Sequence, residues 1–185
     1  MVSKVKSLKV REKGALRSGT ELPSLSVLIP NYNHAKYISE QLDSMLKQSV
    51  LPAEIIILDD ASTDNSLEVL NSYSERYPII KVASNERNMG VEFNINRLTS
   101  MATSDYLFFS AADDKVLPGF FEKTLQMASL HPDLGLISGL VMLIDEKGLE
   151  KGIRLMPIIS KAPIALSPMK ARKKMSVYGR WVQVS

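Results

Sequence analysis

Short apolar runs alternate with helical repeats along most of the chain. Four runs of mostly apolar residues, each followed by polar or small residues, predict strands at residues 25–29, 54–58, 79–83 and 106–109. After each run, apolar residues recur three or four positions apart, which predicts helices that end near Lys47, Tyr77, Ala102 and His131. Repeated strand-helix units are typical of an α/β fold with a doubly wound, mostly parallel sheet flanked by helices.

The apolar spacing also predicts which residues of each helix face the core. We expect these inward positions to be Ile38, Leu42 and Met45; Leu67, Leu70, Tyr73 and Tyr77; Val91, Ile95, Leu98 and Ala102; and Phe121, Leu125 and Ala128. Asn65 and Glu68 have capping-box spacing, so Asp64 and Asn65 are interpreted as helix caps. Pro118 is expected at the first position of the last helix. A further strand is predicted at 136–144, with a turn at 145–148.

The pattern predicts a single folded domain between two less regular ends. Residues 1–23 lack periodicity and carry many basic residues, so we interpret them as a flexible basic leader. Residues 24–150 hold the strand-helix units, and we assign them to one α/β domain. Residues 151–185 are interrupted by three prolines and are expected to be irregular.

Composition narrows the possible chemistry. The chain has 185 residues, no cysteine and two histidines, which argues against disulfides and against a zinc site of thiolates and imidazoles. The net charge of +3 comes largely from the two ends, which we interpret as solvated tails; peripheral contact with anionic lipid is the alternative, and nucleic acid is not expected as a partner. Since no apolar stretch approaches the roughly 20 residues of a membrane span, we expect a cytoplasmic protein, with the inner face of the membrane as a second possible location.

Two pairs of acidic residues follow predicted strands. Asp59-Asp60 ends the second strand, and Asp113-Asp114 follows the fourth after three small residues. The carboxyl ends of parallel strands meet at one edge of a sheet, where open α/β folds bind their ligands. Because adjacent carboxylates repel, the arrangement suggests a divalent ion, and Mg²⁺ or Mn²⁺ prefers oxygen ligands. The alternative for Asp113-Asp114 is a solvated turn.

Four segments in order resemble the successive motifs of family 2 glycosyltransferases. They are Ser26-Val-Leu-Ile-Pro-Asn-Tyr-Asn33, Glu54-Ile-Ile-Ile-Leu-Asp-Asp-Ala-Ser-Thr-Asp64, Asn88-Met-Gly-Val91 and Ala112-Asp-Asp-Lys-Val-Leu-Pro118. The resemblance covers about residues 25–143. It implies a GT-A fold, a Rossmann-like nucleotide-sugar-binding domain, and transfer of a sugar from a nucleoside-diphosphate donor, UDP-linked in our expectation, to an acceptor hydroxyl, with inversion.

The resemblance also implies roles for individual residues. Pro30 and Tyr32 resemble residues that line the nucleotide base, and Asp60 resembles the acid that accepts a hydrogen bond from the uracil imide. Asp113 resembles the ligand of the Mg²⁺ or Mn²⁺ that bridges the diphosphate. Three further positions are expected at the donor: Asn88 and Gly90, which shape a loop around it, and Asp114, as a sugar contact. Asp59 is interpreted as a turn residue.

The sequence departs from the family pattern at two places. Family members commonly carry an acid where this chain has Ala111 or Ala112, and the general base of the family lies on the acceptor side, well downstream of the metal motif. We expect residues 151–185 to be the irregular start of an acceptor-side region that is incomplete, so we can name no catalytic base. The acceptor, saccharide or lipid-linked, stays open. Two alternatives to an active transferase are a nucleotide-sugar-binding remnant without turnover and a flavodoxin-like or response-regulator-like module.

Overall fold

The computed structural model describes residues 21–132, 135–137, 139, 141–145 and 148–153, so the leader up to residue 20 and the segment from residue 154 lie outside the described part. The strands are β1 (Leu25–Asn31), β2 (Glu54–Asp59), β3 (Ile80–Ser84), β4 (Tyr106–Phe109), β5 (Met142–Ile144) and β6 (Glu150–Ile153). The helices are α1 (Ala35–Leu46), α2 (Ser66–Arg76), α3 (Val91–Met101) and α4 (Phe120–Leu130). The predicted order of strand-helix units is confirmed.

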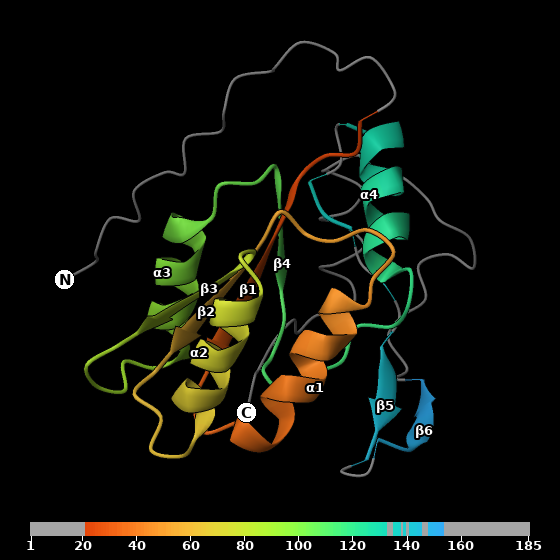
Figure 1. The fold of residues 1–185 in the computed structure, drawn as a ribbon. Coiled ribbons are helices and arrows are strands. Elements are labelled where there is room, and N and C mark those ends of the chain that lie inside the picture. The colour runs from red at the N-terminus through yellow and green to blue at the C-terminus, as the bar shows by residue number, and fades with distance from the viewer. Residues whose placement is uncertain (1–20, 133–134, 138, 140, 146–147, 154–185) are drawn as a thin grey trace, which may run out of the picture.

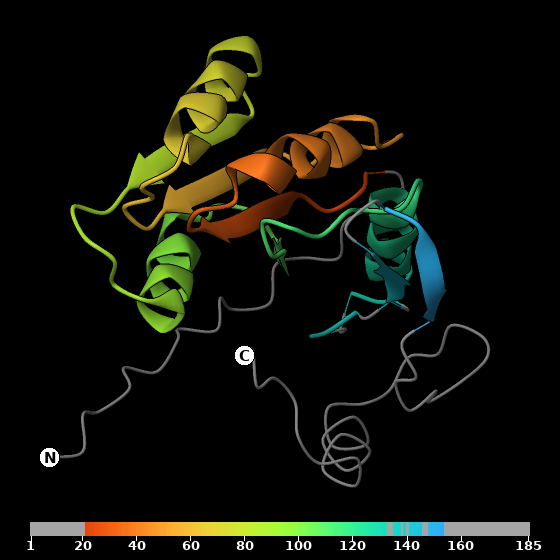
Figure 2. The same cartoon turned by 90° about the horizontal axis from the view of Figure 1, so that it is seen from below.

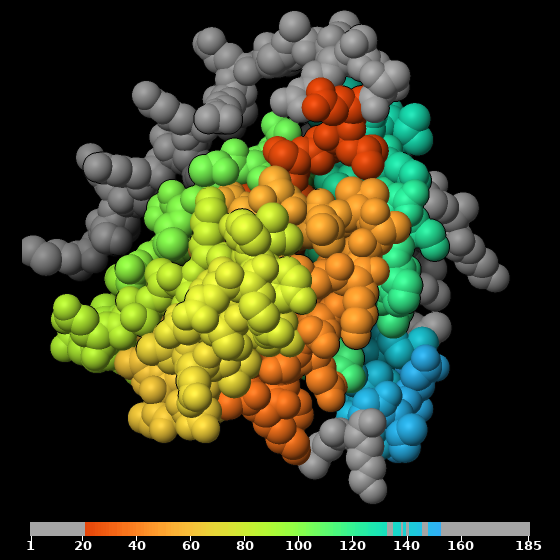
Figure 3. Space-filling view, in the orientation of Figure 1, coloured from red at the N-terminus to blue at the C-terminus, as the bar shows by residue number. Residues whose placement is uncertain are grey.

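The first four strands form one parallel sheet in the order β3-β2-β1-β4. Figures 1 and 2 show α1 and α2 on one face of this sheet and α3 on the other, while α4 stands beside β4. In the space-filling view, α1, α2 and α4 lie side by side, with the β5–β6 hairpin against α1 and α4 (Figure 3). Two layers of helices around a parallel sheet are the arrangement that right-handed crossovers produce.

Each face of the sheet has its own apolar core. On the face covered by α1 and α2, Val27 and Ile29 pack with Ile38 and Leu42, and Phe121 of α4 extends this core. On the opposite face a smaller cluster joins Leu28, Ile56 and Leu58 to Leu98 of α3. The strands β1 and β2 are therefore buried on both faces, as their continuous apolar runs predict.

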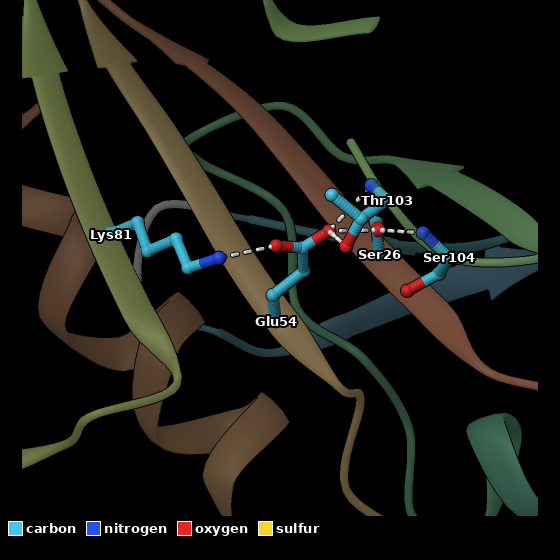
Figure 4. A network of polar contacts seen from close by, with 5 residues as sticks. All are labelled: Ser26, Glu54, Lys81, Thr103 and Ser104. Atoms are coloured by element: carbon cyan, nitrogen blue, oxygen red, sulfur yellow. Dashed lines mark hydrogen bonds and ion pairs between the residues drawn. The ribbon is translucent and has the colours of Figure 1, made fainter. Parts of the chain in front are cut away.

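The buried carboxylate of Glu54 connects the amino ends of the strands through hydrogen bonds. The Glu54 side chain, only 3% exposed, accepts hydrogen bonds from Ser26 Oγ (2.6 Å), Thr103 N (2.8 Å) and Lys81 Nζ (2.7 Å) (Figure 4). Ser26 Oγ in turn accepts from the backbone N–H of Ser104. Burial raises the pKa of Glu54, but the hydrogen bonds from these donors outweigh it and lower the pKa to about 2. This network lies at the edge of the sheet opposite the predicted ligand site.

Several details of the sequence prediction are wrong. The strand predicted at 136–144 is limited to 142–144 within the described residues, because Gly139 lies against the ring of Phe120, where an added Cβ would come within 2.9 Å, instead of pairing with a strand. Helix α4 begins at Phe120 and not at Pro118, since Gly119 takes the cap position in a left-handed conformation. The capping box is also absent, because the Asn65 side chain makes no cap hydrogen bond.

The predicted inward faces of α2 and α3 are partly wrong as well. Leu67 is 37% exposed, because α2 turns Ser66, Leu70 and Tyr73 toward the core. Val91 and Ile95 are exposed, since α3 turns the line of Asn94 and Leu98 toward the sheet. In α2 the small residue Ser66 is buried, and in α3 the polar residue Asn94 is buried, where the apolar spacing predicts larger apolar side chains.

Strand β4 departs from the prediction of a buried strand. Its residues Leu107 and Phe109 are exposed, whereas Phe108 packs against the core that contains Phe121. Among the described residues, the strand lies at one edge of the sheet and pairs with β1 alone. Its apolar run is therefore covered on one face, in contrast to the runs of β1 and β2.

None of the helices in the described ranges is long and apolar enough to cross a membrane. The longest of them, α1, has 12 residues. A helix that spans a bilayer needs about 20 apolar residues.

Candidate donor site

The loops that follow β1, β2, β3 and β4 lie at the carboxyl edge of the parallel sheet, and they carry the residues predicted to bind the donor except Pro30, which lies at the end of β1. Because the strand order is β3-β2-β1-β4, the loop after β1 lies between the loop with Asp60 and the loop with Asp113. This edge is where open α/β sheets bind ligands. The fold therefore brings the predicted residues to one side of the molecule.

Hydrogen bonds join the loops after β1 and β2. Asn31 Nδ2 donates to Asp59 Oδ1 (2.7 Å), and Asp59 also accepts from the backbone N–H and the hydroxyl of Ser62. Asn33 Oδ1 accepts from the backbone N–H of Thr63 (2.8 Å). Asp59 is 1% exposed, and its partners are Asn31 at the end of β1 and Ser62 in the turn after β2, which agrees with the interpretation of Asp59 as a turn residue.

Pro30 and Tyr32 lie at the end of β1 and just beyond it. Strand β1 runs one residue past Pro30, which pairs in register with Leu58. Its missing N–H costs little, because β4 pairs with β1 only as far as Leu28. The Tyr32 side chain is 42% exposed, so its ring is open to a ligand at this edge.

Asp64 caps a helix, although not through the predicted box. Its Oδ2 accepts from the backbone N–H of Ala35, the first residue of α1, at 3.0 Å, and its Oδ1 accepts from the backbone N–H of Ser66 at 2.9 Å. Carboxylates stabilise the positive amino end of a helix. Asp64 therefore acts as a cap, in agreement with its interpretation from the sequence.

Asp60 connects the loop after β2 to the loop after β3. Its carboxylate is 2% exposed and accepts hydrogen bonds from Asn85 Nδ2 (2.6 Å) and from the backbone N–H groups of Met89 (2.8 Å) and Gly90 (2.9 Å). Burial raises the pKa of Asp60, but these hydrogen bonds outweigh it and the pKa is lowered. Asp60 is thus held as a carboxylate next to the Asn88–Gly90 loop.

The Asn88–Gly90 loop has an unusual backbone at Gly90. Gly90 has φ 83° and ψ 162°, a combination that only glycine adopts readily. Asn88 is exposed, and its Oδ1 accepts from the Gly90 N–H at 3.2 Å. The conformation agrees with the prediction that Gly90 shapes this loop.

Asn85, Asn94 and Arg97 lie behind Asp60. Asn85 Nδ2 also donates to Asn94 Oδ1 (2.7 Å), and the Arg97 guanidinium donates to Asn85 Oδ1. Both asparagines are at most 9% exposed. Arg97 therefore supports the Asp60 network within the fold, and this contact gives it a structural role at the donor edge.

Asp113 and Asp114 project from the loop between β4 and α4. Both are exposed, whereas Ala112 and Val116 on either side of them are buried. They line a cavity of about 210 Å³ together with Tyr37 of α1 and with Ile144 and Asp145 of the hairpin. Partial burial of the carboxyl and the charge of Asp113 raise the pKa of Asp114.

The two acidic pairs lie at the same edge of the sheet, but on strands that are not neighbours. Strand β1 separates β2 from β4, and the carboxylates of Asp59 and Asp60 already accept hydrogen bonds from uncharged groups of the protein. Within the described residues, no group of three or more histidine, cysteine, aspartate or glutamate side chains could hold a metal ion.

Sequence reasoning missed several buried polar residues at this edge. Asn94 occupies a core-facing position of α3, and Gln41 is fully buried on α1 between the apolar residues Ile38 and Leu42. The signal in the sequence is a polar residue at a position where the helical period demands an apolar one. Such residues need partners inside the protein, and here the partners are the loops of the site.

Comparison with solved structures supports the fold. Over 59% of this chain and 33% of the other, the structure resembles S. aureus TarS residues 1–349 in complex with UDP, with a TM-score of 0.55 and 29% sequence identity. The same protein has also been solved in complex with UDP-GlcNAc. The GT-A type of α/β fold is thereby confirmed.

Comparison with curated sequences gives the same family. The chain is 39% identical over 110 residues to the uncharacterized glycosyltransferase YibD of Escherichia coli, covering 60% of this chain and 31% of YibD. It is 36% identical over 105 residues to chondroitin synthase of Pasteurella multocida, covering 57% of this chain and 11% of that enzyme. The chain spans about half or less of the length of the curated relatives it matches. The profile named Glycosyl transferase family 2 matches residues 26–178, and the chain belongs to this family.

Proposed function

We propose that the carboxyl edge of the sheet binds a nucleoside-diphosphate sugar, with UDP as the nucleotide. In this proposal Pro30 and Tyr32 line the base, Asp60 accepts a hydrogen bond from the uracil imide, and the Asn88–Gly90 loop closes around the donor. The observation that carries the proposal is the contact of Asp60 with the Asn88–Gly90 loop, which joins two of the sequence motifs at one edge. The similarity to a UDP-binding structure gives independent support.

The acidic residues after β4 fit a hard divalent cation. Mg²⁺ and Mn²⁺ are commonly held by one or two carboxylates, with water and substrate phosphates completing the shell. Asp113 and Asp114 are adjacent, exposed and beside a cavity, so they offer one or two ligands of this type. We propose that Asp113 holds the ion and that Asp114 contacts the sugar. When bound, the ion would neutralise the negative charge of the diphosphate leaving group.

The proposed reaction is transfer of the sugar to an acceptor hydroxyl with inversion at the anomeric carbon. The hydroxyl oxygen forms the new bond to the anomeric carbon as the bond to the diphosphate breaks, and the hydroxyl proton passes to a base. Among the described residues we assign no base, and we propose that the base belongs to an acceptor-binding part of the protein. The acceptor is a saccharide or a lipid-linked molecule.

A titration with nucleotides tests the donor site. We expect UDP to bind more tightly than CDP, because cytosine lacks the imide N–H that Asp60 would accept, and we expect Mn²⁺ to raise the affinity for UDP. Asp60→Asn should remove the preference for UDP over CDP, whereas Asp113→Ala should remove only the gain due to Mn²⁺. Asp105→Asn is the matched control, since Asp105 lies at the opposite edge, where it accepts from Ser24. Equal binding of UDP and CDP by the unsubstituted chain would count against the proposed base contact, and no binding of UDP would overturn the proposal.

A separate measurement distinguishes transfer from binding alone. The chain is incubated with UDP-sugar and Mn²⁺, and release of UDP is followed over hours. Release of UDP would exclude the alternative of a nucleotide-sugar-binding protein without turnover. Tight donor binding without release would favour that alternative.

A further inference from the structure

One side of α1 carries polar residues where a buried helix face would be apolar. Gln41 and Ser44 are three residues apart on α1 and therefore lie on the same side of the helix, and Gln48 follows two residues after the helix ends. Gln41 is 0% exposed, Gln48 is 7% exposed and Ser44 is partly buried. We call these three residues the α1 polar ladder.

The α1 polar ladder contacts both ends of the loop that carries Asp113. At the first end, Gln41 Nε2 donates to Ser110 Oγ (3.0 Å) and to the carbonyl oxygen of Ala111. At the second end, Ser44 Oγ accepts from the backbone N–H of Val116 (3.0 Å), and Gln48 Nε2 donates to the carbonyl oxygen of Leu117 (3.0 Å).

The loop is thus fixed at its ends and open in the middle. Ala112 and Val116 are 2% and 8% exposed and join the core around α1 and α4, whereas Asp113 and Asp114 between them are exposed. Lys115 forms an ion pair with Glu40, the residue next to Gln41 on α1. The position of the Asp113 backbone is therefore set by α1.

Packing alone does not account for the α1 polar ladder. Burying an amide costs free energy unless both of its polar atoms are hydrogen-bonded. Gln41 Oε1 and Gln48 Oε1 are buried and have no hydrogen-bond partner within the described residues. Leucine or methionine would fill the same space without this cost. The contacts that these glutamines do make are all to the loop or to α1 itself.

We infer that Gln41 and Gln48 are positioning residues for the divalent cation of the donor complex. They hold the backbone of residues 111–117 so that the Asp113 carboxylate is presented at one place for the cation and the diphosphate. This inference rests on the proposed function, because it assumes that Asp113 binds the ion. It differs from a purely structural role, in which loss of the glutamines would change stability and leave metal affinity unchanged.

The test measures UDP binding by calorimetry, with and without Mn²⁺, together with thermal unfolding. The variants are Gln41→Leu and Gln48→Leu, which keep the approximate volume and remove the hydrogen bonds. We expect each to bind UDP without metal within about twofold of the unsubstituted chain. The Mn²⁺ concentration that gives half of the gain in UDP affinity should rise by about tenfold or more, as is typical when residues that orient metal ligands are changed.

Ser26→Ala is the matched control for lost stability. Ser26 is fully buried and its hydroxyl bonds to Glu54, but it lies at the amino end of β1, away from the loop. This variant should lower the unfolding temperature and leave the Mn²⁺ requirement unchanged. If a glutamine variant does not fold, Ser44→Ala makes the same test, because it removes the acceptor for the Val116 N–H and otherwise only a hydrogen bond to the Gln41 carbonyl within α1.

The outcomes separate the inference from the proposed function. An unchanged Mn²⁺ requirement in the folded variants would overturn the inference and leave the donor site intact. A raised requirement that also appears in Ser26→Ala would overturn it too, since lost stability would then explain the effect. If the unsubstituted chain binds no UDP under either condition, the proposed function is wrong and the inference is wrong with it.

Discussion

Replacement of Glu54 by glutamine should make the free energy of unfolding less dependent on pH. The carboxylate is buried, and it accepts hydrogen bonds from Ser26, Thr103 and Lys81 at the amino ends of the strands. Glutamine has nearly the same shape and can still accept from Ser26 or Thr103. It loses the negative charge that pairs with Lys81, and its amide group donates where the carboxylate accepts.

The size of the effect follows from the pKa of Glu54, which falls from 4.5 to about 2 in the folded protein. Since each pKa unit corresponds to about 1.36 kcal/mol, the charged form stabilises the fold by at most about 3 kcal/mol. The folded pKa is the lower one, so this stabilisation is fully present above about pH 5. It is lost as the pH falls from about 5 toward 2, because the unfolded chain then binds the proton first.

Urea unfolding at pH 7, 5, 4 and 3 measures the free energy of unfolding of the unsubstituted protein and of Glu54→Gln. Asp60 and Asp64 also have lowered pKa values and contribute to the acid sensitivity of both, so the difference in unfolding free energy between the proteins isolates Glu54. We expect a difference of about 2–3 kcal/mol at pH 7 that shrinks as the pH falls to 3. A difference that stays constant over this range would refute the assignment of Glu54 as a buried carboxylate with a lowered pKa.

Two further substitutions test the backbone and the core. Gly90→Ala should cost roughly 1–3 kcal/mol of stability, because its φ and ψ suit only glycine and no atom lies within 4 Å to add a clash. Gly135→Ala, where φ is ordinary and the space is also open, is the control, and an equal cost for both in urea unfolding would contradict the reasoning. Phe121→Ala should cost about 3–5 kcal/mol, since Phe121 is 0% exposed in the core between β4 and α4. Leu130→Ala, at a residue that is 74% exposed, should change stability by less than about 0.5 kcal/mol, and a similar loss in both variants would show that α4 does not pack as described.

The strand-helix order could be predicted from the sequence because it depends on local patterns. The apolar runs of β1 and β2 are buried on both faces, so their composition leaves little choice of structure. The small residues and carboxylates after β2 and β4 fall at strand ends, and parallel pairing brings such ends to one edge. The positive φ of Gly90 agrees with its predicted place in a loop around the donor.

Contacts between distant parts of the chain could not be predicted in the same way. The separation of Asp60 from Asp113 depends on the place of β1 between β2 and β4, which no local pattern encodes. The burial of Asn94 depends on its partner Asn85, a loop residue from another element. The contacts of Gln41 and Gln48 with the Asp113 loop could not be predicted from local patterns either, because these glutamines bond to residues about 70 positions away.

The most direct test of the donor site is to locate the cation in the complex with UDP. Mn²⁺ is added to the isotope-labelled chain with and without UDP, and the paramagnetic broadening of each backbone amide signal is measured by NMR. The proposed site predicts strong broadening of the amides of residues 110–116 when UDP is present, and much less broadening in Asp113→Ala. Broadening centred elsewhere, or equal broadening of these amides in Asp113→Ala, would contradict the assignment of this edge as a metal-dependent donor site.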